Sequence, residues 1–135
     1  MEFNLGTIFK SIIAAGGAAV TYLYGGWSPL LGILLAFVAI DYVTGFLAAA
    51  VNGKLSSDVG LKGIAKKIFV FVMVAVGHLV DRAVGTEIIM NAAIFFYIAN
   101  ELLSIIENSG TIGLPVPPAI LKAVDVLKGK AEEDV

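Results

Sequence analysis

Residues 29–51 read PLLGILLAFVAIDYVTGFLAAAV, and Asp41 is the one charged residue in this run. A helix needs roughly 17–25 mainly apolar residues to cross a lipid bilayer, and this run is long enough. Proline is favoured at the first position of a helix, so Pro29 marks the expected start. We therefore predict a transmembrane helix over residues 29–51.

Three further apolar stretches surround this run. The first is rich in alanine and glycine, carries Lys10 near its start, and is modest enough in hydrophobicity to lie in the membrane interface instead of crossing. Glycine-containing breaks separate the stretches. The predicted spans are residues 7–24, 29–51, 64–84 and 88–106.

The character of the chain changes after residue 107. Residues 110–118 are rich in glycine and proline, residues 118–128 can form one short amphipathic helix, and residues 132–134 are acidic. The fold class predicted is an all-α integral membrane bundle of four transmembrane helices with a short C-terminal amphipathic helix. Residues 1–109 would form the transmembrane domain, and residues 110–135 a cytoplasmic segment.

The composition favours lipid as the surrounding solvent. The 135 residues are 59% apolar and 15% charged, whereas a soluble domain is about 45–50% apolar and about 25% charged. The formal net charge of −2 disfavours a nucleic-acid partner. Without cysteine, and with a single histidine, the chain offers no disulfide framework and little basis for a metal site. We find no catalytic motif and expect neither an enzyme nor a cofactor.

The lysines predict the orientation of the chain in the membrane. The break at residues 52–63 and the start of the next span contain four lysines and only one acidic residue. The lysines are Lys54, Lys62, Lys66 and Lys67, and the acidic residue is Asp58. Cytoplasmic loops carry an excess of lysine and arginine, so this break should be cytoplasmic. Four spans would then place both termini in the cytoplasm, and the N-terminus would move only if the first stretch does not cross.

Several ionisable residues lie inside the predicted spans. A carboxylate at the centre of a bilayer costs roughly 2.5–3.5 kcal/mol on the insertion scale, so Asp41 should face a partner or a cavity, or be protonated. Counting from the helix ends places Asp41 within about one or two turns of His78 in depth. Glu101 is about level with Lys66 and Lys67, although lysines at this depth can also extend to the lipid headgroups.

Polar residues also form a stripe along the fourth span. Tyr97, Glu101, Ser104 and Asn108 follow spacings of four, three and four, and Asn100 and Glu107 flank them. Such a stripe can seal a bundle through hydrogen bonds between helices, or it can line water once subunits assemble.

Small residues recur at helical spacing in two spans. They are Gly45, Ala49 and Gly53 in the second, where Thr44 lies beside Gly45, and Gly17, Thr21 and Gly25 in the first. Small side chains let membrane helices approach closely. Each stripe can therefore pack within one subunit or join two.

Two blocks of sequence resemble a known family. One is Asp41-Tyr42-Val43-Thr44-Gly45, followed by Lys54-Leu55-Ser56-Ser57, Gly60-Leu61-Lys62-Gly63 and Lys66-Lys67. The other runs from Tyr97 through Asn100–Asn108 to Gly113 and residues 115–118. In this order they resemble the toxin-secretion/phage-lysis holin family, which includes clostridial toxin-release holins, over about residues 29–127.

The resemblance implies a function that spacing alone does not show. Such holins accumulate in the bacterial cytoplasmic membrane, associate with one another, and form lesions that release an endolysin or a toxin. The resemblance implies roles in assembly and topology, and no catalytic role, for Asp41, Thr44, Gly45, Ser56, Gly60, Lys66, Lys67, Asn100, Glu101, Ser104, Glu107 and Asn108.

Two other functions stay open at this point. A small ion channel or transporter could relay protons or cations through Asp41 and His78, because ionisable residues inside membranes mark such paths. Alternatively, an accessory membrane subunit could anchor a partner through residues 115–135.

Overall fold

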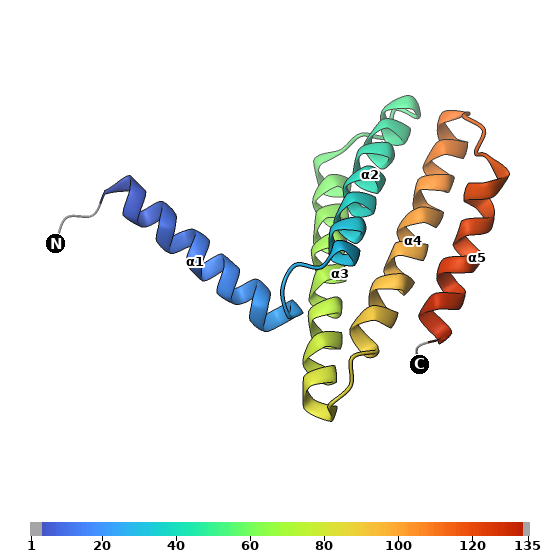
Figure 1. Cartoon of the computed structure of the whole chain (residues 1–135). Helices are drawn as coiled ribbons and strands as arrows, with labels where there is room; N and C mark the ends of the chain where they lie inside the picture. The colour runs from blue at the N-terminus through green and yellow to red at the C-terminus, as the bar shows by residue number, and fades with distance from the viewer. Residues whose placement is uncertain (1–3, 134–135) are drawn as a thin grey trace.

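The computed structural model describes residues 4–133, which form five α-helices and no strand (Figure 1). The helices are α1 (Leu5–Tyr24), α2 (Pro29–Val51), α3 (Ser57–Val84), α4 (Ile89–Ile112) and α5 (Pro118–Glu133). The first four are long and apolar enough to cross a membrane. The predicted all-α membrane fold with a C-terminal helix is thereby confirmed.

Polar caps and glycines set the helix ends. The side chains of Asn4, Ser28 and Ser56 each accept a hydrogen bond from the backbone N–H three residues later, which satisfies a donor that the helix leaves free. At the other ends, Gly25 closes α1 at φ 74° and Gly85 closes α3 at φ 78°. Glycine is favoured in this left-handed conformation, where a side chain would be strained.

Three helix boundaries differ from the prediction by five residues or more, the starts of α1 and α4 differ by one or two residues, and α2 agrees with it. Helix α3 begins at Ser57 instead of residue 64, α4 continues to Ile112 instead of residue 106, and α5 continues to Glu133 instead of residue 128. Counting apolar residues found the part of each helix that suits lipid, whereas the helices themselves run on through polar turns. Of the acidic run at 132–134, residue 134 lies outside the described residues.

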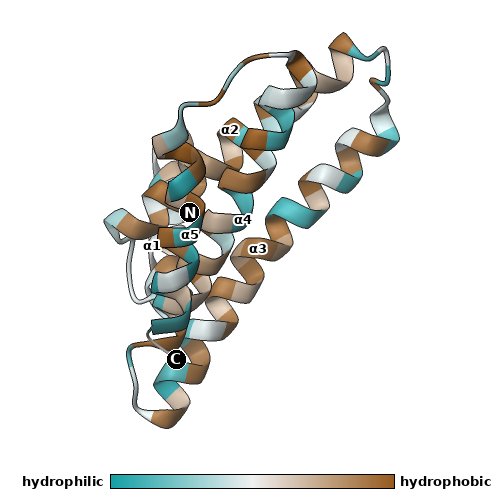
Figure 2. Cartoon of the chain, turned by 90° about the vertical axis from the view of Figure 1, so that its right-hand side faces the viewer, coloured by the Kyte–Doolittle hydropathy of each residue, from teal (hydrophilic) through white to brown (hydrophobic). Residues whose placement is uncertain are grey.

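Helix α4 is the centre of the bundle. It packs against α2, α3 and α5, whereas α2 and α3 touch only briefly (Figures 1 and 2). Where Gly77 of α3 faces the start of α4, a methyl group on this glycine would lie 3.2 Å from Met90 Cα. The absence of a side chain at this position therefore lets the two backbones meet.

The apolar core occupies one end of the bundle. Its buried members are Leu31, Leu34, Val38, Val74, Met90, Ile94 and Ile98. All seven lie in the halves of α2, α3 and α4 that are remote from the α2–α3 loop. The other half of the bundle is therefore held by different interactions.

Helix α1 leans away from the other helices (Figure 1). None of its residues is buried, and it contacts only α3. The Tyr24 hydroxyl donates a hydrogen bond of 2.9 Å to the Phe71 carbonyl oxygen, which fixes the end of α1. The rest of the helix is left as an exposed apolar arm.

Candidate functional site: a buried ion cluster beside a cleft

Three charged side chains from three helices meet inside the bundle. Lys67 of α3 lies between Asp41 of α2 and Glu101 of α4, and forms an ion pair with each carboxylate. Its Nζ is 3.0 Å and 3.3 Å from the two Glu101 carboxylate oxygens. Asp41 and Glu101 are each only 6% exposed. We call these three residues the ion cluster.

Asn108 extends the ion cluster toward the end of α4. Its Nδ2 donates to Asp41 Oδ1 at 3.0 Å and to Thr44 Oγ1 at 2.9 Å. Gly45 lies against this amide: a methyl group there would be in van der Waals contact with Asn108 Nδ2, at 3.5 Å. The glycine predicted to serve helix packing therefore packs within the subunit, against α4.

The electrostatics of the ion cluster couple the three helices. An isolated charge in lipid is costly, whereas a paired and hydrogen-bonded one is tolerated. The single ammonium serves two carboxylates, and Asn108 supplies a further donor to Asp41. Sliding or rotating one helix would separate these partners, so the cluster fixes how α2, α3 and α4 align.

A cleft of about 710 Å³ opens beside the ion cluster. Its walls come from the second half of α2, the α2–α3 loop, the first turns of α3 and the end of α4. Ala49, Ser104 and Glu107 line it, together with Asp41 and Lys67. The cleft is where α2 and α3 separate, which is the half of the bundle without the apolar core.

The prediction of Glu101 level with Lys67 is confirmed by their ion pair. The pairing considered for Asp41 and His78 is wrong, because Asp41 contacts Lys67 and Asn108. His78 packs beside Gly25 at the end of α1, and its Nε2 is buried without a hydrogen-bond partner. Counting residues along each helix predicts the depth of a side chain but not the direction in which it points.

The remaining predicted residues lie apart from the ion cluster. Lys66, Asn100 and Gly53 are exposed, and Gly53 forms part of the turn after α2. Tyr97 packs against the apolar core. The polar stripe of α4 is therefore divided: Glu101 and Asn108 bind the other helices, Glu107 is exposed along the cleft, and Asn100 is exposed away from it.

Asp81 is a structural residue that the sequence reasoning missed. Its carboxylate accepts hydrogen bonds from the Thr86 hydroxyl at 2.6 Å and from the backbone N–H groups of Ile89 and Met90 at 2.9 and 2.8 Å. It therefore caps α4 from the end of α3, while Ile88, at the cap position itself, makes no side-chain cap. The signal available was an acidic residue shortly before a helix start that lacks its own cap.

Curated relatives of the chain come from several bacteria. An uncharacterised protein of Halalkalibacterium halodurans is 51% identical over 90% of this chain and 95% of the relative. One of Listeria monocytogenes is 41% identical over 94% and 91%. A 14.9 kDa protein of Clostridium perfringens, described as lying in the nagH 3′ region, is 34% identical over 94% and 98%.

No solved structure matches the chain. The model of the bacteriophage holin family matches residues 18–129, which contain the end of α1 and nearly all of α2 to α5. The matched region includes the ion cluster, the cleft and the Asp81 cap. This multi-pass membrane protein belongs to the bacteriophage holin family.

Proposed function

We propose that this protein is a holin that forms lesions in the bacterial cytoplasmic membrane and carries out no enzymatic reaction. The family match over residues 18–129 is the observation that supports this most strongly. Four helices suited to a membrane and an ion cluster that aligns three of them agree with it. The lesions would release an endolysin or a secreted toxin.

The proposed topology follows from the lysine-rich end of the bundle. Lys54, Lys62 and Lys66 are exposed around the α2–α3 loop, and this end would face the cytoplasm. With four crossings, both termini of a dispersed subunit would lie in the cytoplasm. The ends of α2 and α4 and the start of α3 then lie on the cytoplasmic side, together with the cleft.

Lesions would form by a change in population as subunits accumulate. Dispersed subunits keep their buried charges paired, and association becomes favourable above a threshold density. The small-residue stripe of α2 packs inside the subunit at Gly45, so it is less suited to join two subunits. In α1, a methyl group at Gly17 would meet no other atom within 4 Å, so this stripe has no neighbour within the subunit. We propose that subunits contact one another there.

The alternative channel function would need a relay between Asp41 and His78, and no contact between these two residues supports it. Asp41 is paired with Lys67, and His78 lies against the start of the α1–α2 connection. A proton path would need a chain of polar groups joining the two.

Timed expression in bacteria tests the holin proposal. Cells would express the chain, a cytosolic endolysin, or both, and the optical density of each culture would be followed. We expect abrupt lysis only when both are present, because the endolysin needs lesions to reach the cell wall. Gradual growth of the doubly expressing culture, with the chain recovered in the membrane fraction, would argue against a holin.

A further inference from the structure

Helix α5 extends deep along the bundle. It runs beside α4 in the opposite direction (Figure 1). Val124 is 7% exposed, and Leu127 packs against the apolar core. The core residues on α4 are Met90, Ile94 and Ile98, all in the half of α4 that is remote from the α4–α5 turn. The docked α5 therefore reaches beyond the middle of a transmembrane helix.

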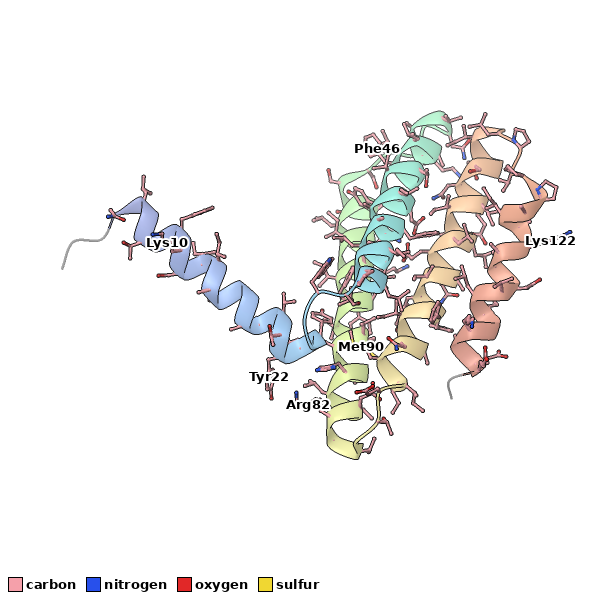
Figure 3. The ribbon with its side chains drawn as sticks, viewed as in Figure 1. Lys10, Tyr22, Phe46, Arg82, Met90 and Lys122 are labelled. Carbon is pink, nitrogen blue, oxygen red and sulfur yellow. The ribbon has the colours of Figure 1, made fainter. Side chains whose placement is uncertain are left out.

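The outer face of this helix is charged. Lys122, Asp125 and Lys128 follow one another at spacings of three and are exposed. In Figure 3 the Lys122 side chain points away from α4. In Figure 2, where α5 lies toward the viewer, hydrophilic residues recur along it. The docked helix thus presents charges at membrane depth, outward from the bundle.

Lipid cannot cover that face at low cost. A charged residue at the bilayer centre costs roughly 2.5–3.5 kcal/mol, and an adjacent acyl chain offers no hydrogen bonds in return. No ion pair joins Lys122, Asp125 or Lys128 to another described residue. Either α5 leaves α4 while lipid surrounds the subunit, or its outer face meets water.

Glu101 and Asn108, the two polar residues of α4 that are bound to other helices, do not offer an equivalent surface. Glu101 is 6% exposed and bound to Lys67, and Asn108 is bound to Asp41 and Thr44. Exposing them to water would break the ion cluster. The charged residues of α5 need no such disruption, since Val124 and Leu127 stay packed against the bundle while Lys122, Asp125 and Lys128 are exposed.

We propose that α5, docked on α4, forms the water-facing wall of the lesion. This inference rests on the proposed holin function. In a dispersed subunit, α5 lies at the cytoplasmic surface, in agreement with the sequence-based expectation for this segment. In an assembled lesion, α5 docks along α4, and its row of lysine and aspartate side chains faces the aqueous path.

Substituted cysteines test this assignment, because the natural chain contains no cysteine. Asp125→Cys and Lys128→Cys each place a single thiol on the outer face of α5. If one of the two variants fails to fold, the other still tests the proposal. Lys54→Cys is a matched control in the exposed α2–α3 loop. Phe69→Cys is a control on the apolar outer surface of α3, where the side chain is 59% exposed.

Each variant would first form lesions in proteoliposomes and then react with a bulky, water-soluble polyethylene-glycol maleimide. The flux of a fluorescent dextran through the existing lesions is the readout. We expect labelling at residues 125 and 128 to reduce the flux several-fold. Labelling at residue 54 should leave the flux unchanged, and residue 69 should stay unlabelled because lipid covers it.

The outcomes separate the two proposals. Efficient labelling at residues 125 and 128 with unchanged dextran flux would overturn the placement of α5, as would failure of both to react in leaky vesicles. If the unlabelled protein releases nothing at any density, the holin function itself fails.

Discussion

Lys67 Nζ lies 3.0 Å from Glu101 Oε2, and the same ammonium forms an ion pair with Asp41. This contact joins α3 to α4 at the end of the bundle where the apolar core is missing. Ion pairs therefore hold α2, α3 and α4 together in the half of the bundle that lacks the apolar core.

Replacing Lys67 by methionine removes the ammonium and keeps the length of the side chain. Two buried carboxylates then lose their counter-charge, and breaking a buried pair in this way costs about 3 kcal/mol. We expect a lower thermal unfolding temperature in detergent and less protein in the membrane fraction. Lys66→Met is the matched control, since Lys66 is the exposed neighbour. Equal effects of the two substitutions would contradict the importance of the ion cluster.

Replacing Asn108 by leucine removes the donor that Asp41 and Thr44 share. Leaving buried acceptors unsatisfied costs about 1–2 kcal/mol, so the free energy of unfolding should fall by that amount. Asn100→Leu makes the same chemical change at an exposed position two turns earlier on α4 and should not destabilise. Unfolding in denaturing detergent mixtures would compare them, and a larger loss for Asn100→Leu would show that the assignment is wrong.

Replacing Asp81 by alanine deletes the cap of α4. Loss of a cap together with unsatisfied backbone donors should destabilise by about 2 kcal/mol. We also expect faster hydrogen exchange at the amides of Ile89 and Met90, because these two amides donate to Asp81 in the unsubstituted protein. Glu87→Ala removes one negative charge from the exposed part of the same turn and serves as the control. Unchanged exchange at both amides would rule out the cap.

Replacing Gly77 by leucine forces a side chain into the approach of α3 to α4. A methyl group alone would lie 3.2 Å from Met90 Cα, so the larger side chain must push the helices apart. Overpacking of this kind costs about 1–3 kcal/mol. Gly16→Leu is the control, because a methyl group there meets nothing within 4 Å. Thermal unfolding of the two variants should differ clearly, and similar values would disprove the close approach.

The sequence predicted the helices better than it predicted their contacts. Helix α2 was placed at 29–51 because Pro29 starts it and the apolar run ends with it. The start of α3 was missed because its first turns carry Lys62 and Lys66, which an apolar count rejects. Ser56 was the better signal, since it caps the helix by accepting from Val59 N–H.

Correct helix ends would have improved the prediction of the ion cluster. Asp41 lies ten residues before the end of α2, Lys67 ten residues after the start of α3, and Glu101 eleven residues before the end of α4. At roughly 1.5 Å per residue, all three are about 15–17 Å from the same end of the bundle. Depth thus places the three partners at one level of the bundle, although it does not distinguish Lys67 from Lys66. Which faces turn together depends on packing, as His78 shows by facing Gly25.

The holin function is tested most directly by release of a folded protein from vesicles. Purified chain would be reconstituted at increasing protein-to-lipid ratios into vesicles that contain a folded fluorescent protein and a small dye. We predict that both are released together above a threshold ratio. Release of the small dye alone, or selective and reversible ion flux at every ratio, would contradict the holin function and favour a channel.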